Sequence, residues 1–194
     1  MLKRILRFII RLTAAGTLLL VLFLLFLRSN LNPKIDQKVV QEIITEVEGS
    51  PELPKRFAEF FNQYHNSQKL IPHLYDIFNS NKSECPCVWA TSILSFNTDR
   101  SIIMSNQYVY AAHIIKKVSN RQCLNLIAYQ YDFLYNTTSL KRASRLYFNK
   151  ELNELNDIEL QTFVIMMKNP LLYNPIRNPE NLKKQLEFFN PEIP

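Results

Sequence analysis

The sequence contains only two glycines, Gly16 and Gly49, among 194 residues. A glycine-rich phosphate loop and a dinucleotide-binding turn each need several closely spaced glycines, because the backbone must approach the phosphates closely. Proteins that bind nucleotides through such loops are therefore excluded. The chain is long enough for one domain with a substantial core and too short for two ordinary domains.

Acidic residues are absent from the first thirty positions, which hold five of the 23 basic residues. The remaining chain carries 18 basic and 17 acidic residues, so its net charge is only +1, although the whole chain formally carries +6. A strongly basic domain that binds nucleic acid is therefore not expected.

One long apolar run follows this basic start, the sixteen uncharged residues from Leu12 to Leu27. At about 1.5 Å per residue the run is slightly shorter than a bilayer core of about 30 Å, and snorkelling of Arg11 and Arg28 lengthens it. Four basic residues before the run and one just after it favour a cytoplasmic N-terminus. We therefore predict a single-pass anchor in the cytoplasmic (inner) membrane, with the domain on the periplasmic or other extracytoplasmic side.

A cleaved signal peptide has the same order of basic and apolar residues and is the alternative to an anchor. The sequence LRSNLNP after the apolar run lacks a small-x-small cleavage pattern, which favours the anchor.

The rest of the chain has apolar residues at helical spacing and no long alternating run. Gly49-Ser50-Pro51 separates two of the helical segments. Ser119 with Gln122, and Asn156 with Glu159, have the spacing of capping boxes and predict two helix starts. The first helix is expected to run through CLNLIAYQYDFLY, residues 123–135. The second contains IELQTFVIMMK and is expected to be the buried centre of the domain.

Residues 143–185 read ASRLYFNKELNELNDIELQTFVIMMKNPLLYNPIRNPENLKKQ. They resemble the end of the peptidoglycan glycosyltransferase domain of glycosyltransferase family 51, in a shortened and degenerate form. That family reads Ala-x-x-x-Tyr-Phe-Gly-Lys, a Leu-acidic segment, a buried helix with Glu-Ala, and Tyr-x-Pro-x-Arg-Asn-Pro-Glu. The matching residues are Ala143, Tyr147, Phe148, Lys150, Leu155, Glu159, Tyr173, Asn174, Pro175, Arg177, Asn178, Pro179 and Glu180. Residues 118–129 are similar to an earlier helix junction of the family.

We expect a mainly α protein, in which the apolar run forms a single N-terminal transmembrane helix and the resemblance implies a helical, lysozyme-like domain after it. We expect a basic cytoplasmic N-terminus and anchor over residues 1–28, an amphipathic helical linker over 29–50 and a transglycosylase-like domain over 51–194. Residues 168–179, here called the proline crossing, contain three prolines and are expected to have a structural role, with Asn178 or Asn181 capping the next helix.

The two carboxylates that the family uses are missing from the corresponding positions. The family's catalytic base belongs to a Glu-Asp-x-x-Phe-x-x-His motif, whereas Glu59 lies six residues before His65 instead of seven and no Asp follows it. The family's second Glu corresponds to Gln107, which forms hydrogen bonds but carries no charge. General-base catalysis contributes roughly 10² to 10⁴-fold, so most of the rate should be lost. Glu59 and Glu84 are the weak candidates for a relocated base.

A basic stretch from Arg100 to Lys150 holds eight basic residues and one acidic residue. Lys141, Arg142 and Arg145 share one side of a predicted helix and are the best candidates for a phosphate contact. In the family this region lies near the membrane and the lipid pyrophosphates, so the resemblance implies an anionic-lipid surface. A solvated helix face is the alternative interpretation.

Three cysteines complete the candidate residues. Cys85 and Cys87 flank Pro86, and a disulfide from either of them to Cys123 is expected in an oxidising exterior. A bridge between Cys85 and Cys87 would be strained by its short ring. No metal site is predicted, because the thiols and histidines lack a recognised ligand spacing.

These patterns predict a membrane-anchored, transglycosylase-like protein of the bacterial cell envelope. The leading hypothesis is a pseudoenzyme or weakened relative that binds lipid-linked peptidoglycan precursor or an envelope protein. An active peptidoglycan glycosyltransferase with a relocated carboxylate and a purely structural envelope subunit are the alternatives. Neither a cofactor nor a nucleic-acid partner is expected.

Overall fold

The computed structural model describes residues 2–27, 35–65, 85–97 and 107–189. Within these ranges the regular elements are helical, and the only pairing of extended backbone is an isolated antiparallel bridge between Asp132 and Thr138. The mainly α class predicted from the sequence is confirmed.

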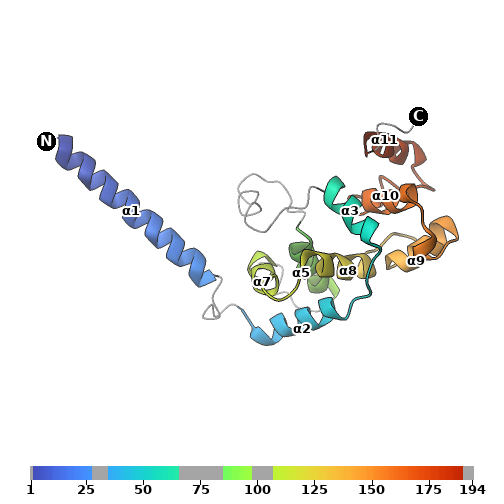
Figure 1. The fold of residues 1–194 in the computed structure, drawn as a ribbon, viewed down its shortest axis with the longest axis horizontal. Helices are drawn as coiled ribbons and strands as arrows, with labels where there is room; N and C mark the ends of the chain where they lie inside the picture. The colour runs from blue at the N-terminus through green and yellow to red at the C-terminus, as the bar shows by residue number, and fades with distance from the viewer. Residues whose placement is uncertain (1, 28–34, 66–84, 98–106, 190–194) are drawn as a thin grey trace.

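Helix α1 (Leu2–Leu27) extends away from the other helices (Figure 1). Its segment Arg4–Phe26 is long and apolar enough to cross a membrane, and none of it is buried within the protein. Thr13 and Thr17 donate their hydroxyl hydrogen bonds to carbonyl oxygens three residues earlier, at 3.0 and 2.9 Å. The helix backbone thus satisfies the two hydroxyls, as an apolar environment requires.

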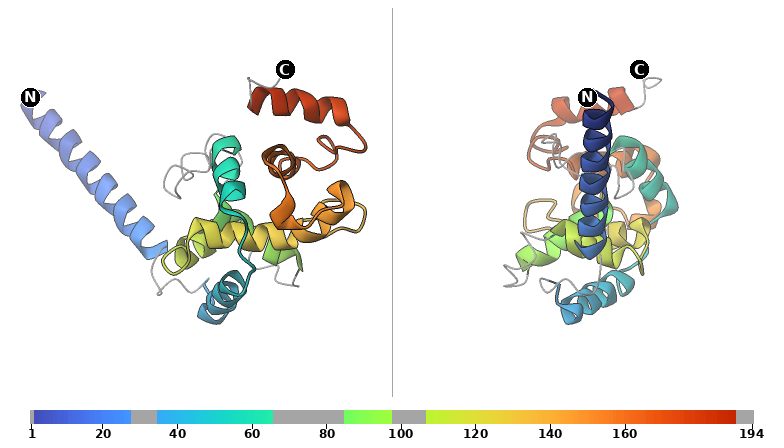
Figure 2. Two further views of the ribbon diagram at one scale, coloured as in Figure 1. Left: turned by 45° about the vertical axis from the view of Figure 1, so that its right-hand side comes forward. Right: turned by 90° about the vertical axis from the view of Figure 1, so that its left-hand side faces the viewer.

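The other helices form two neighbouring groups (Figures 1 and 2). Their bounds are α2 (Gln37–Glu48), α3 (Lys55–Tyr64), α5 (Pro86–Asn97), α7 (Gln107–Ile114), α8 (Asn120–Gln130), α9 (Leu140–Phe148), the 3₁₀ helix η1 (Leu152–Glu154), α10 (Asp157–Met166) and α11 (Pro179–Phe189). In the first group α5 and α2 each pack against α7 and α8; in the second, α10 packs against α3 and α11.

Residues 29–50 were expected to be an amphipathic helical linker, and Gln37–Glu48 form the amphipathic helix α2, which packs against α7 and α8. Asp36 caps its start by accepting a hydrogen bond from the Lys38 N–H at 2.8 Å. Its apolar face is buried against α7 and α8, because four aliphatic side chains recur at helical spacing. The helix ends at Gly49, where the sequence predicted a break.

Helix α8 begins at the predicted capping box and is shorter than predicted. Ser119 and Gln122 exchange the two capping hydrogen bonds. The helix ends at Gln130, because Tyr131 takes an extended conformation and its carbonyl accepts a hydrogen bond from the Ser139 N–H at 3.0 Å. The Asp132 side chain also accepts from the Leu134 N–H at 2.8 Å, which competes with helical bonding. The predicted continuation to residue 135 is wrong.

Helix α10 is the buried centre that the sequence predicted. Asn156 and Glu159 form the second capping box, and every residue from Leu160 to Met166 is buried. The Phe163 ring lies edge-on to the rings of Phe133 and Phe148, with both centroid distances 5.3 Å. Aromatic side chains from α9 and the preceding turn therefore pack around α10.

Helix α9 ends at Phe148 and is capped by Asn149, which has left-handed backbone angles of φ 53° and ψ 39°. The family resembled by this segment has glycine there, and asparagine is the other residue that adopts this conformation at modest cost. The Asn149 N–H donates to the carbonyls of Ser144 and Arg145, which closes the helix.

Asn149→Val is expected to lower the free energy of unfolding by about 1–2 kcal/mol, because a branched side chain clashes with left-handed backbone. Asn149→Gly should be neutral or slightly stabilising, because glycine has no Cβ. Urea unfolding of both variants beside the wild type measures the difference. Equal stability of the valine and glycine variants would contradict this account.

Candidate functional site

The basic face of α9 consists of Lys141, Arg142 and Arg145, all of them exposed. Ser139 precedes the helix, and its hydroxyl accepts a hydrogen bond from the Arg142 N–H at 3.4 Å. Leu140, Ala143 and Ser144 are buried on the opposite face. Burial of these residues holds the helix so that its three cations face solvent.

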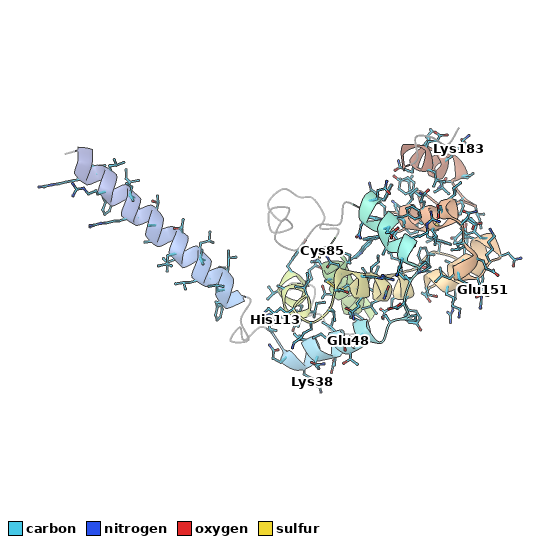
Figure 3. All side chains as sticks on the ribbon, viewed as in Figure 1. Lys38, Glu48, Cys85, His113, Glu151 and Lys183 are labelled. Atoms are coloured by element: carbon cyan, nitrogen blue, oxygen red, sulfur yellow. A yellow bond between two sulfur atoms is a disulfide. The ribbon has the colours of Figure 1, made fainter. Side chains whose placement is uncertain are left out.

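Arg145 is held by a carboxylate six residues later. Its Nε and Nη2 atoms lie 2.7 and 3.0 Å from the two oxygens of Glu151, near the labelled Glu151 in Figure 3. The hydrogen bonds from Arg145 lower the pKa of the Glu151 carboxyl, and the same bonds raise the pKa of Arg145. Among the described residues neither Lys141 nor Arg142 forms an ion pair, although the charge of Lys141 also helps to lower the pKa of the Glu151 carboxyl. These two cations are therefore the better candidates for contact with an external anion.

Lys150 and Glu159, both matched to the family pattern, form an ion pair of 2.7 Å. The Glu159 side chain is only 13% exposed, and its second oxygen accepts from the Asn156 N–H at 2.8 Å. Through Lys150, Glu159 joins the segment after α9 to the first turn of α10, and its second oxygen completes the capping box of α10. This carboxylate has a structural role.

Tyr147 and Asn174 connect α9 to the proline crossing. The Tyr147 hydroxyl donates to the Phe133 carbonyl at 2.5 Å and accepts from the Asn174 side-chain amide at 2.9 Å. Burial raises the pKa of the Tyr147 hydroxyl. Asn174 is completely buried, and its side-chain oxygen accepts from the N–H groups of Ile176 and Arg177 at 2.9 and 3.0 Å.

Asparagine side chains also shape the two ends of the crossing. The Asn169 side chain accepts from the N–H groups of Leu171 and Leu172, at 3.1 and 3.0 Å. Asn178 directly precedes α11, and its amide donates to the Leu171 carbonyl at 2.7 Å. Asn181 lies inside α11 and is therefore wrong as a candidate cap. Each of the three prolines follows one of the turn asparagines Asn169, Asn174 and Asn178.

Of the candidate catalytic residues, the structure describes Glu59 and Gln107. Glu59 is exposed on α3, and Glu84 lies outside the described residues. Gln107 is the first residue of α7, and its side-chain oxygen accepts from the Ser92 hydroxyl. In the described residues, no hydrogen bond or ion pair connects Glu59 or Gln107 to this face.

Sequence reasoning missed a pocket between the starts of α3 and α10. Its volume is about 580 Å³, and it is lined by Arg56, Phe60, Leu155, Asn156, Asp157, Ile158 and Gln161. Arg56 forms an ion pair with Asp157 and lies 5.8 Å from the centroid of the Phe60 ring. Arg56 and Asp157 are 101 residues apart in sequence, so no local pattern could have paired them.

The disulfide joins Cys87 of α5 to Cys123 of α8, with a Cα–Cα distance of 5.0 Å. It is one of the two pairings that the sequence left open. Cys85 is buried, which raises the pKa of its thiol, and its sulfur lies 3.8 Å from the Asn120 side-chain oxygen. Among the described residues, no group of three His, Cys, Asp or Glu side chains is placed to hold a metal ion.

His65 has a structural environment. It is buried, its Nε2 atom lies 3.0 Å from the Val164 carbonyl, and its ring stacks on Phe61 with a centroid distance of 4.3 Å. Tyr131 links the same region to the end of α10 through a 2.9 Å hydrogen bond to the Met167 carbonyl.

The fold and these contacts define a helical domain in which several motif residues hold α9, α10 and the proline crossing together, beside an exposed basic face. A family model described as Transglycosylase matches residues 94–190, which is half of the chain. The chain therefore belongs to the transglycosylase family. The match includes Gln107, α9 and the crossing, whereas Glu59 precedes it. No curated protein matches the chain.

Proposed function

We propose that this chain is a membrane-anchored, transglycosylase-like protein of the cell envelope that binds lipid-linked peptidoglycan precursor without polymerising it. The observation that carries the proposal is Gln107, a neutral amide at the position matched to the family's second glutamate, in a chain that keeps the family's C-terminal motif residues. An amide forms hydrogen bonds but has no negative charge with which to stabilise a developing cation or accept a proton.

The basic face of α9 supports binding of an anionic ligand. Lys141 and Arg142 are exposed, and both are outside the Arg145–Glu151 ion pair. Lysine and arginine make charge-assisted hydrogen bonds to phosphate oxygens, which are stronger than neutral ones. A lipid-linked pyrophosphate supplies such oxygens at a membrane surface.

The carboxylates near α9 favour binding over catalysis. A general base must be within hydrogen-bond reach of the hydroxyl that it deprotonates, with an oxygen able to take the proton. Glu151 is held by Arg145, which lowers the pKa of its carboxyl and so weakens it as a base. Both oxygens of Glu159 are engaged by Lys150 and Asn156.

Helix α1 supports attachment to the cytoplasmic membrane. It is long and apolar enough to span a bilayer, and the basic residues before its apolar run favour a cytoplasmic N-terminus. The domain would then lie outside the cytoplasm, where the Cys87–Cys123 disulfide is compatible with oxidising conditions.

Purified full-length protein in detergent should bind labelled lipid-linked disaccharide pyrophosphate and form no glycan polymer. The double variant Lys141→Glu with Arg142→Glu should weaken binding at least about tenfold, because hydrogen bonds to charged groups contribute about 1.5–3 kcal/mol each. Lys183→Glu with Lys184→Glu makes the same charge change on α11 and should leave the affinity unchanged. A binding titration and a polymerisation assay, run on the same preparations, measure both properties.

The possible results separate the three functions. Polymer formation would contradict the proposal, favour an active glycosyltransferase and direct alanine substitutions to Glu59 and Glu84. Absence of both binding and polymer would favour the purely structural envelope subunit. Equal weakening by the α9 and α11 variants would show that net charge, and not the α9 face, governs binding.

A further inference from the structure

The proline crossing exposes three aliphatic side chains within six residues. Leu171, Leu172 and Ile176 are 53%, 41% and 61% exposed, and we call them the apolar turn. Single exposed aliphatic residues are ordinary on a protein surface, whereas several on one short segment indicate a contact surface.

The N–H groups of this turn are satisfied from within the proline crossing. Asn169 accepts from the N–H groups of Leu171 and Leu172, and Asn174 accepts from those of Ile176 and Arg177. The N–H groups of Tyr173 and Asn178 donate to backbone carbonyls at 3.0 and 2.8 Å. The Leu171 carbonyl accepts from Asn178. Prolines occupy three further positions of the crossing and have no N–H to satisfy.

Charge around the turn is positive. Lys168 and Arg177 are exposed at its two ends, and no acidic residue occurs between Glu159 and Glu180. Basic side chains beside exposed aliphatic ones match the interface of a membrane that contains anionic lipids.

We propose that the apolar turn inserts into the interfacial layer of an anionic lipid bilayer. Irregular backbone enters an apolar environment at lower cost where its polar groups have partners, and the asparagine turns provide partners for the N–H groups and for the Leu171 carbonyl. The interfacial layer still holds water and headgroups that can bond to the other carbonyls. A protein surface would also accept aliphatic side chains. The bilayer is favoured because the turn is flanked by cations and the same chain carries a helix able to span a membrane.

Insertion of the apolar turn would attach the domain to the bilayer at a second place, apart from the anchor. Helix α2, which follows the anchor, and helix α11, which follows the turn, lie at opposite ends of the domain in Figures 1 and 2. A contact at the turn adds a second attachment and holds the domain along the bilayer. The hydrogen bond between Asn174 and Tyr147 joins this contact to α9. The inference goes beyond precursor binding and does not depend on it.

The test uses the full chain in vesicles of phosphatidylcholine and phosphatidylglycerol whose acyl chains are brominated near the headgroup. Ile176→Trp places a fluorophore on the turn, and Ile158→Trp is the matched control, an aliphatic position on α10 that is 45% exposed. Both variants keep Trp89, the only native tryptophan, as a common background. Leu172→Trp is a second turn variant, and circular dichroism checks that each variant is folded.

The turn tryptophans should lose about half of their added emission in brominated vesicles relative to unbrominated ones, because an interfacial side chain lies about 5–10 Å into the headgroup and acyl boundary. Ile158→Trp should lose little. Brominated vesicles of phosphatidylcholine alone should quench the turn tryptophans less than brominated vesicles that also contain phosphatidylglycerol. Equal quenching by the two kinds of vesicle would contradict the role of the flanking cations.

Equal quenching of the turn and control variants would overturn the inference. Emission that is blue-shifted but unquenched in vesicles would also overturn it, and would indicate that protein covers the turn. Vesicle flotation of the same samples reports on α1 separately. If the protein floats with the vesicles but the turn tryptophans are not quenched, only the insertion of the apolar turn is overturned. If the protein does not float, attachment to the membrane through α1 is overturned as well.

Discussion

Replacing Cys87 and Cys123 together with alanine is expected to lower the free energy of unfolding by about 3–4 kcal/mol. The two residues are 36 positions apart, so the bridge closes a long loop and restricts the unfolded chain. The loop contains the rest of α5 and the whole of α7, both of which pack in the same group as α8. Loss of the bridge should therefore weaken the first helical group most directly.

Denaturant unfolding with and without a thiol reductant measures this contribution. Reduction breaks the bridge without removing atoms, so it separates the disulfide from the loss of two buried side chains in the double variant. Cys85→Ala is the matched control, because Cys85 is buried two residues away and is outside the bridge. This control should remain sensitive to reductant, whereas the double variant should not. Insensitivity of the wild type to reductant would contradict the prediction.

Features that depend on nearby residues could be predicted from the sequence. Both capping boxes form as expected, because a side chain and a backbone N–H three residues away meet in any helix that starts there. The buried centre of α10 was predictable because its residues are apolar around the whole helix. The break at Gly49 follows from turn-forming residues.

Features that depend on distant residues could not be predicted. The helix after Ser119 was predicted too long, because the end of α8 is set by a turn that brings Tyr131 back to Ser139. Residues 29–50 were interpreted as an amphipathic helical linker, and an amphipathic pattern does not say which helices its apolar face packs against, here α7 and α8. The Arg56–Asp157 pair and the pocket beside it depend on the packing of α3 against α10.

The basic face of α9 shows how a charge count can mislead. The positive stretch counted from the sequence ends at Lys150, one residue before Glu151, and this carboxylate holds Arg145. Three cations on one face thus become two available cations and one ion pair. Two charged residues that match the family pattern, Lys150 and Glu159, are likewise paired with each other in an ion pair.

Asn174→Ala is expected to lower the free energy of unfolding by about 2–4 kcal/mol, because it leaves buried partners without hydrogen bonds. Asn174 is completely buried and makes three side-chain hydrogen bonds, to Tyr147, Ile176 and Arg177. Asn169→Ala is the matched control. It also removes an asparagine side chain that accepts hydrogen bonds from two backbone N–H groups. Because Asn169 is exposed, water can accept those hydrogen bonds instead, and the free energy of unfolding should fall by only about 1 kcal/mol.

A double-mutant cycle with Tyr147→Phe isolates the contact between α9 and the proline crossing. Removal of the Tyr147 hydroxyl and of the Asn174 amide should be less than additive by about 0.5–1.5 kcal/mol, the usual net contribution of one hydrogen bond. Additive effects would contradict a direct coupling between the two elements. Coupling would instead mean that Asn174 supports both the apolar turn and the basic face of α9. Its side chain accepts a hydrogen bond from the Ile176 N–H of the turn, and it donates one to Tyr147 of α9, the helix that carries Lys141 and Arg142. Asn174→Ala in the Ile176→Trp background should then reduce quenching by brominated lipid, while Asn169→Ala should reduce it less.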